Sequence, residues 1–179
     1  MNLSIPSINF KQLNEAETVN RLHDACRDWG FFKLIDHPIS PLVSETLMQT
    51  MRQFFAQTQA AKQAVSRDEE NPWGYFDKEL TKNRQDWKEI FDLGRDQVGP
   101  YASKTPWPAD IQDFQKVMLD WHQRCEAIAI SLIKAICSGL SNDPGTLIAA
   151  FRPRNSSFLR LNHYPICTDP SDPGVDFPD

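Results

Sequence analysis

This sequence lacks any apolar run approaching the ~20 residues that a membrane-spanning helix needs. Its N-terminus, MNLSIPSINF, also lacks the basic residues followed by an apolar stretch that form a secretory signal peptide. We therefore expect a cytoplasmic protein without a membrane partner.

Positive charge is scarce as well. The 179 residues include 19 Lys and Arg against 24 Asp and Glu, which gives a formal net charge of −5. Nucleic acids and anionic membrane surfaces are bound by clustered Lys and Arg. Neither is expected to be a partner of this chain.

Cysteine is rare, and no C-x-x-C pair occurs among the four cysteines. A disulfide framework is not expected in a chain of this length without a secretory signal. Cys26, Cys125 and Cys137 fall at apolar helical positions, which predicts reduced, buried side chains. His122 and Cys125 form an isolated H-x-x-C without a second ligand pair, so a zinc site is not expected there.

What the sequence does contain is mostly helix. A first helix is predicted after Asn14, which with Glu17 resembles a capping box, and Gly30 is expected to end it in a left-handed conformation. Its predicted apolar stripe is Val19, Leu22, Cys26 and Trp29. A second helix is predicted from Ser40 as N-cap and Pro41 as first residue. Its predicted buried face is Leu47, Met51, Phe54 and Phe55.

Further helices are expected downstream. A short one is predicted around 60–66, and the longest lies within 105–140, where apolar residues recur every three or four positions as far as Gly139. Asp143 and Pro144 then resemble the start of a short helix that ends at Phe151.

Strands are expected only at the margins, in SIPSINF, FFKLID and SFLRLNHYP. Residues 68–104 are predicted to be loop-rich, with DWKEIFDLG as either a short strand or a turn of helix. The fold class is therefore α+β. Because a lone strand is not stable, the partners of the last strand are expected to lie outside this sequence.

Several phrases occur in a fixed order: ACRDWGFFKLIDHPIS, FFAQTQAAKQ, WGYF, DWKEIFDLG, the long helix with Trp121, and FLRLNHYPIC. This series resembles the N-terminal part of the isopenicillin N synthase-like Fe(II)- and 2-oxoglutarate-dependent oxygenases. The resemblance runs from about Ile5 to about Cys167.

The resemblance implies a helical region packed against a double-stranded β-helix, or jelly roll. It divides the chain into a helical N-terminal region, 1–152, and the start of the oxygenase domain, 153–179, with its first jelly-roll strand. In the family, a His-x-Asp pair and a distal His hold Fe(II), and an Arg-x-Ser pair grips 2-oxoglutarate.

The iron ligands of the family have no match here. The residues two positions after the four histidines are Ala25, Ile39, Arg124 and Pro165, so no His-x-Asp or His-x-Glu pair exists. We expect the chain to stop before the metal-binding barrel and to bind neither Fe(II) nor 2-oxoglutarate in the manner of the family. No catalytic or metal-ligating residue is predicted within it.

Asn162 and Tyr164 match the N-x-Y-P positions of the family. The resemblance implies that Tyr164 donates to a carboxylate of 2-oxoglutarate and that Asn162 lies near the same molecule; the alternative is a core tyrosine with a satisfied hydroxyl. Strand alternation turns His163 the other way, toward a structural role.

Other polar residues suggest structural roles. His37 lies in a predicted turn. Asp86, Glu89 and Asp92 are interspersed with Lys and Arg and are expected in a solvated, salt-bridged segment. Tyr75 and Phe76 are candidates for the border of a substrate pocket.

The function expected by resemblance is the N-terminal part of an oxygenase that oxidises a small molecule, inactive as this chain. Two alternatives remain open. One is an oxidase or ascorbate-using relative that does not take 2-oxoglutarate. The other is a non-catalytic helical module that binds a partner, such as the missing barrel portion.

Overall fold

Helices account for most of the regular secondary structure in the computed structural model, which describes residues 4–81, 84–94, 104–151 and 157–166. The chain divides into two compact units, 1–44 with 123–155 and 45–122 with 156–179. The mixture of helix and strand confirms the predicted α+β class in outline. The predicted boundary between residues 152 and 153 lies outside the described residues.

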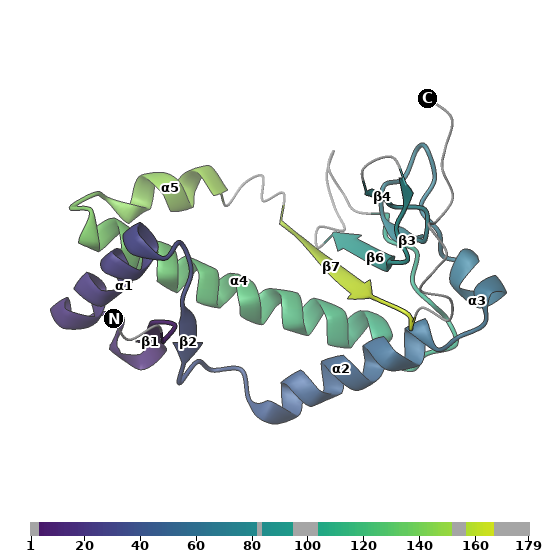
Figure 1. Cartoon of the computed structure of the whole chain (residues 1–179), viewed down its shortest axis with the longest axis horizontal. Coiled ribbons are helices and arrows are strands. Elements are labelled where there is room, and N and C mark those ends of the chain that lie inside the picture. Colours follow the sequence, from purple (N-terminus) through teal and green to yellow (C-terminus); the bar gives the residue numbers. More distant parts are fainter. Residues whose placement is uncertain (1–3, 82–83, 95–103, 152–156, 167–179) are drawn as a thin grey trace. The chain divides into compact units, whose positions relative to one another are not determined.

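The first unit contains a small parallel sheet and the helices around it (Figure 1). Strand β1 (Ser7–Asn9) pairs with β2 (Lys33–Ile35), and a 3-10 turn, η1 (Phe10–Gln12), follows β1. The helices are α1 (Ala16–Asp28), α5 (Pro144–Phe151) and the C-terminal part of α4 (Phe114–Gly139). Its core consists of Ile8, Leu13, Leu22 and Ala135.

The ends of α1 show one correct prediction and one error. Gly30 has φ +75 and its N–H donates to Ala25 O, as a left-handed C-terminal cap requires. The N-cap is Glu15 rather than Asn14, without a side-chain hydrogen bond. The buried face is also rotated from the predicted stripe, so Ala25 is buried and Cys26 exposed. Of the three cysteines predicted to be buried, Cys137 is buried, whereas Cys26 and Cys125 are exposed.

The second unit begins within α2 (Pro41–Phe55), whose start is as predicted, since the Ser40 hydroxyl accepts from Val43 N–H at 3.4 Å. Helix α3 (Gln59–Gln63) follows, capped by Thr58. The segment expected to be loop-rich holds β3 (Gly74–Phe76), β4 (Leu80–Thr81), β5 (Arg84–Gln85) and β6 (Glu89–Gly94).

The last strand, β7 (Phe158–His163), does have a partner within the chain, so that expectation was wrong. It pairs antiparallel with β6 from Glu89–His163 to Gly94–Phe158, and β6 also pairs with β3. The DWKEIFDLG segment thus supplies the central strand of the sheet β3-β6-β7 (Figure 1). It is buried on both faces, which explains why it shows no alternation of apolar and polar residues.

One face of this sheet packs against helices of the same unit. Phe54 of α2 is fully buried, with its ring centroid 5.0 Å from Phe91 of β6 and 5.3 Å from Phe114 of α4. Leu161 of β7 joins the same cluster. In the parts of the chain that the structure describes, no helix is both long and apolar enough to cross a membrane.

Candidate functional site

The two faces of β7 have different surroundings. Leu159, Leu161 and His163 face the helical core, and the His163 ring stacks on Phe55 at 5.0 Å between centroids and 18° between planes. This confirms that His163 faces away from its neighbours in sequence. Residues 158, 160 and 162 lie on the opposite face, called the outward face below.

The predicted cofactor residues lie on or just beyond this outward face. Asn162 pairs with Ile90 of β6 and is exposed. Tyr164 follows the strand and is 67% exposed in this chain. Their role toward 2-oxoglutarate stays a prediction.

Arg160, two residues before Asn162, forms the best-defined polar contact of the outward face. Its Nε and Nη2 donate to Asp92 Oδ1 and Oδ2 at 2.8 and 2.7 Å, a bidentate pair across adjacent strands. These hydrogen bonds raise the pKa of Arg160 above its ordinary value. Asp92 is buried, so the pair fixes the guanidinium on the sheet.

This pair is the centre of a charge chain that we define as Arg67, Asp92, Arg160, Glu79 and Lys88. The flanking contacts are longer: Arg67–Asp92 at 3.9 Å, Arg160–Glu79 at 3.6 Å and Lys88–Glu79 at 3.9 Å. Signs alternate along the chain, and three cations against two anions leave a net charge of +1. Sequence reasoning missed Arg160 because 68 residues separate it from Asp92.

Aromatic rings flank the charge chain. The Phe158 ring, 52% exposed, lies 6.2 Å from the Trp73 ring and 5.9 Å from Arg160 Cζ. Arg67 Cζ lies 3.4 Å from the centroid of Phe76, so that ring lies beneath a cation. Tyr75 is fully buried in the core, so its predicted place at a pocket border was wrong.

On the core face, a second ion pair joins α3 to the sheet. Lys62 Nζ lies 2.6 Å from Glu89 Oε2, and the two side chains are 7% and 18% exposed. The prediction that the DWKEIFDLG segment forms salt bridges is confirmed. The prediction that it is solvated was wrong, because most residues of β6 are buried. Next to this pair, burial raises the pKa of the Tyr75 phenol above its ordinary value.

Metal-ligating residues do not gather in the described parts of the chain, where no group of three or more His, Cys, Asp or Glu could hold a metal ion. His122 is buried with Nε2 at 3.3 Å from Ser157 Oγ, and Cys125 is exposed. His37 is exposed beside the bend after β2. These residues therefore do not fit an iron site.

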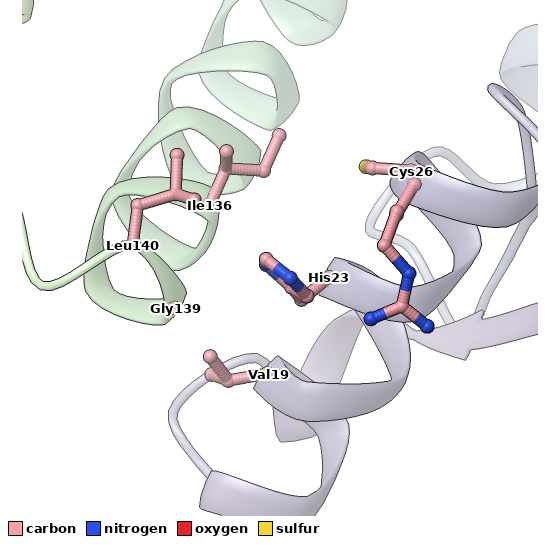
Figure 2. Close-up of a pocket in the computed structure, with 7 residues that line it drawn as sticks. Val19, His23, Cys26, Ile136, Gly139 and Leu140 are labelled. Atoms are coloured by element: carbon pink, nitrogen blue, oxygen red, sulfur yellow. The ribbon is translucent and has the colours of Figure 1, made fainter.

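A small apolar pocket lies in the first unit, between α1 and the end of α4. Val19, His23 and Cys26 face Ile136, Gly139 and Leu140 across it (Figure 2). Its lining includes the His23 imidazole, the Cys26 thiol and the Arg27 side chain, but no carboxylate. None of the predicted site residues belongs to it.

The described parts of the chain form a helix-rich segment with a three-stranded antiparallel sheet, whose outward face carries polar side chains. The chain belongs to the family described as non-haem dioxygenase in morphine synthesis N-terminal, whose profile matches residues 5–110. This confirms the resemblance to the N-terminal region of the Fe(II)- and 2-oxoglutarate-dependent oxygenases.

Two relatives illustrate the family. The oxoglutarate-dependent flavonoid 7-O-demethylase 1 of Ocimum basilicum is 29% identical over 165 residues, which cover 87% of this chain and 42% of that protein. The 1-aminocyclopropane-1-carboxylate oxidase of Diospyros kaki is 27% identical over 92% of this chain and 51% of its own length. The chain thus spans about half the length of these curated relatives.

A solved structure gives the same result. A full-length Neurospora crassa protein, crystallised in complex with alpha-KG, is 28% identical, with a TM-score of 0.77 over 90% of this chain and 54% of that one. The observed elements therefore have counterparts in a protein that was solved with this 2-oxo acid.

Proposed function

We propose that this chain is the N-terminal part of an Fe(II)- and 2-oxoglutarate-dependent oxygenase that oxidises a small molecule. Family membership supports the class, and the exposed outward face of β7 is the single observation that carries the proposal. The similar Neurospora crassa protein was solved with alpha-KG, which is 2-oxoglutarate, and with thymine.

In this proposal the chain contributes to the binding of 2-oxoglutarate. The Tyr164 hydroxyl and the Asn162 amide are donors on or just beyond one strand, and both side chains are exposed. Donors of this kind suit carboxylate oxygens. Bound 2-oxoglutarate would supply the reducing equivalents for oxidation by O₂, while these residues hold and orient it.

The chain does not contain the His-x-Asp or His-x-Glu pair that would bind iron in this family. We propose a division into a mostly helical region, 1–152, and the beginning of a jelly-roll domain, 153–179, whose first strand, β7, pairs with β6 of the preceding region. The absence of a His-x-Asp or His-x-Glu pair supports the further proposal that the 179-residue chain alone does not turn over.

The direct test is an assay of the purified chain with Fe(II), ascorbate, O₂ and 2-oxoglutarate. Succinate should not exceed the protein-free blank, and robust turnover would contradict the proposal of inactivity. The class itself is tested by reading the transcript beyond codon 179. A frame that encodes His-x-Asp, a distant His and Arg-x-Ser supports the oxygenase; a frame that continues without them contradicts it.

An oxidase that does not take 2-oxoglutarate is the second candidate. The similarity to a 1-aminocyclopropane-1-carboxylate oxidase favours it. The two candidates differ in the co-substrate. The test requires a longer protein that also carries the iron ligands. If that protein consumes O₂ with ascorbate but forms no succinate, it is the oxidase, whereas succinate formed from 2-oxoglutarate identifies the oxygenase.

A non-catalytic partner-binding module is tested on the isolated chain. A monomer on gel filtration with one cooperative melt favours a module that is stable by itself. Aggregation favours a chain that exposes apolar surface normally covered by further protein.

A further inference from the structure

The pocket between α1 and the end of α4 brings a thiol and an imidazole together. His23 and Cys26 are three residues apart in α1, so their Cβ atoms lie about 5–6 Å apart on one face of the helix. Figure 2 shows the His23 ring and the Cys26 Sγ directed toward α4, and both residues line the pocket. Cys26 is exposed and His23 is half-buried, so a reagent from solution can reach the thiol.

The rest of the pocket suits a small apolar molecule. Its volume is about 240 Å³, which exceeds the ~150 Å³ of a cavity that binds benzene and is below the roughly 300–1,000 Å³ of drug-sized sites. Val19, Ile136 and Leu140 form apolar walls. A Cβ on Gly139 would lie 3.2 Å from Val19 Cγ1, so α4 approaches α1 closely at the position that has no side chain.

The charge at the edge of the pocket does not favour an anion. Arg27 lines the pocket, but it forms a bidentate pair with Asp28 at 2.6 and 2.9 Å and lies 3.1 Å from Asp24. Its positive charge is therefore already compensated by carboxylates of the same helix. With apolar walls and a compensated cation, the pocket suits an uncharged molecule.

A thiol beside an imidazole is equipped for nucleophilic addition. The thiolate is the reactive form of cysteine, and imidazole is the side chain that takes up and releases a proton near neutral pH. Asp28 can compensate the charge on the imidazolium that forms. The pKa of Asp28 is lowered by the hydrogen bond and charge of Arg27 and, to a smaller extent, by the charge of His23. Cys26 and His23 thus supply a nucleophile and its base.

We propose that Cys26 is a modification site for small, uncharged α,β-unsaturated carbonyl compounds whose apolar tail occupies this pocket. The thiol proton passes to His23, the sulfur electron pair forms a C–S bond at the β-carbon, and the C=C electron pair becomes an enolate. His23 then returns the proton to the α-carbon. The net reaction adds S–H across a C=C bond, so it needs no oxidant or reductant. The proposal does not depend on the proposed function, because the pocket and the outward face of β7 share no residue.

Cys125 is a matched control within the chain. It has the same spacing to a histidine, His122, and is also exposed. Its surroundings differ, because partial burial of the thiol raises the pKa of Cys125, and His122 Nε2 lies 3.3 Å from Ser157 Oγ. Neither Cys125 nor His122 is among the described residues that line the pocket. Cys125 therefore reports the reactivity of an exposed thiol without the pocket.

The test treats the purified 179-residue chain with trans-2-hexenal and, separately, with acrolein, which has the same reactive group without the propyl tail. Tryptic peptides separate the two thiols, since Cys26 lies in 22–27 and Cys125 in 125–134, and mass spectrometry then follows each rate. We expect the ratio of the Cys26 rate to the Cys125 rate to be about tenfold higher with trans-2-hexenal, because only the pocket buries the tail. Equal ratios for the two reagents would overturn the proposal.

Two leucine variants test whether the pocket holds the tail. Leu140 lines the pocket and Leu147 of α5 does not, although the two side chains are similarly exposed, at 51% and 49%. Leu140→Ala should lower the rate of trans-2-hexenal at Cys26 about threefold and leave the rate of acrolein unchanged. Leu147→Ala should change neither rate. Equal effects of the two variants would contradict the proposal.

Two further variants test the chemistry. His23→Gln should slow both reagents at Cys26, and free imidazole in solution should restore part of the rate, which it would not do after a purely structural loss. An unchanged rate in His23→Gln would overturn the role of His23 as base. Cys26→Ser should leave peptide 22–27 unmodified, and an adduct on that peptide would place the reaction on His23 instead. If a variant does not fold, the comparison of reagents and of Cys26 with Cys125 in the native chain still decides.

Discussion

Lys62 Nζ and Glu89 Oε2 lie 2.6 Å apart and join α3 to the first residue of β6. Lys62 also lies 5.4 Å from the Tyr75 ring centroid. With so little access to water, each charge is tolerated because the other compensates for its lost hydration. The pair thereby connects a short surface helix to the central strand of the sheet.

Removal of one partner is expected to be costly. Lys62→Met should lower the free energy of unfolding by about 3 kcal/mol, because the Glu89 carboxylate is left largely buried without its cation. The double variant Lys62→Met/Glu89→Leu should recover part of the loss. Urea denaturation measures both, with Arg27→Met on the exposed surface of α1 as a control that should leave stability unchanged. A double variant less stable than Lys62→Met would contradict this account.

Phe54 should contribute more to stability than any exposed residue of the same helix. Its ring is fully buried between Phe91 and Phe114. Phe54→Ala is expected to cost about 3–5 kcal/mol through lost burial and the cavity left behind. Met48→Ala, at an exposed position of α2, should stay within ~0.5 kcal/mol. Similar melting temperatures for the two variants would show that this core is not tightly packed.

Gly74 begins β3 with φ +115, where a Cβ would meet the carbonyl oxygen of Val65. Gly30 also has positive φ, +75, but open space at the Cβ position. Gly30→Ala should therefore cost only the conformational term, about 1–2 kcal/mol. Gly74→Ala should cost more, because backbone must move as well. Equal losses in chemical denaturation would mean that the Val65 segment shifts freely.

Tyr75 predicts a pH dependence at the alkaline end. Burial raises its pKa in the folded state above the value of 10 that holds when the chain is unfolded. The unfolded state therefore loses the phenol proton first, and the stability that Tyr75 contributes declines as pH rises above about 10. In urea denaturation between pH 9 and 11, native protein should lose stability more steeply than Tyr75→Phe. Parallel curves would show that the phenol ionises alike in both states.

Local sequence signals predicted the helix boundaries well where the cap is made by the backbone or by one adjacent side chain. Ser40 and Gly30 are examples, since both act within a few residues of themselves. Asp143 is another, because it accepts from Gly145 N–H at 3.0 Å at the start of α5. Asn14 failed because α1 begins one residue later than its capping-box pattern indicates.

The sheet and its polar face were beyond local reasoning. The pairing of β6 with β7 links positions on either side of α4, and nothing near Glu89 or Arg160 in sequence specifies the other strand. The bidentate partner of Asp92 was missed for the same reason. Alternation along β7 did predict which way His163 points, because that depends only on the strand's own geometry.

The order of the strands in the sheet has a consequence during synthesis on the ribosome. Strand β6 is complete at Gly94, but its partner β7 begins only at Phe158, after the whole of α4. At about 5–20 residues per second, one edge of β6 waits several seconds for its neighbour. During that interval the carboxylate of Asp92 has no Arg160, so the nascent chain carries an open strand edge and a carboxylate without its bidentate partner at the centre of its future sheet.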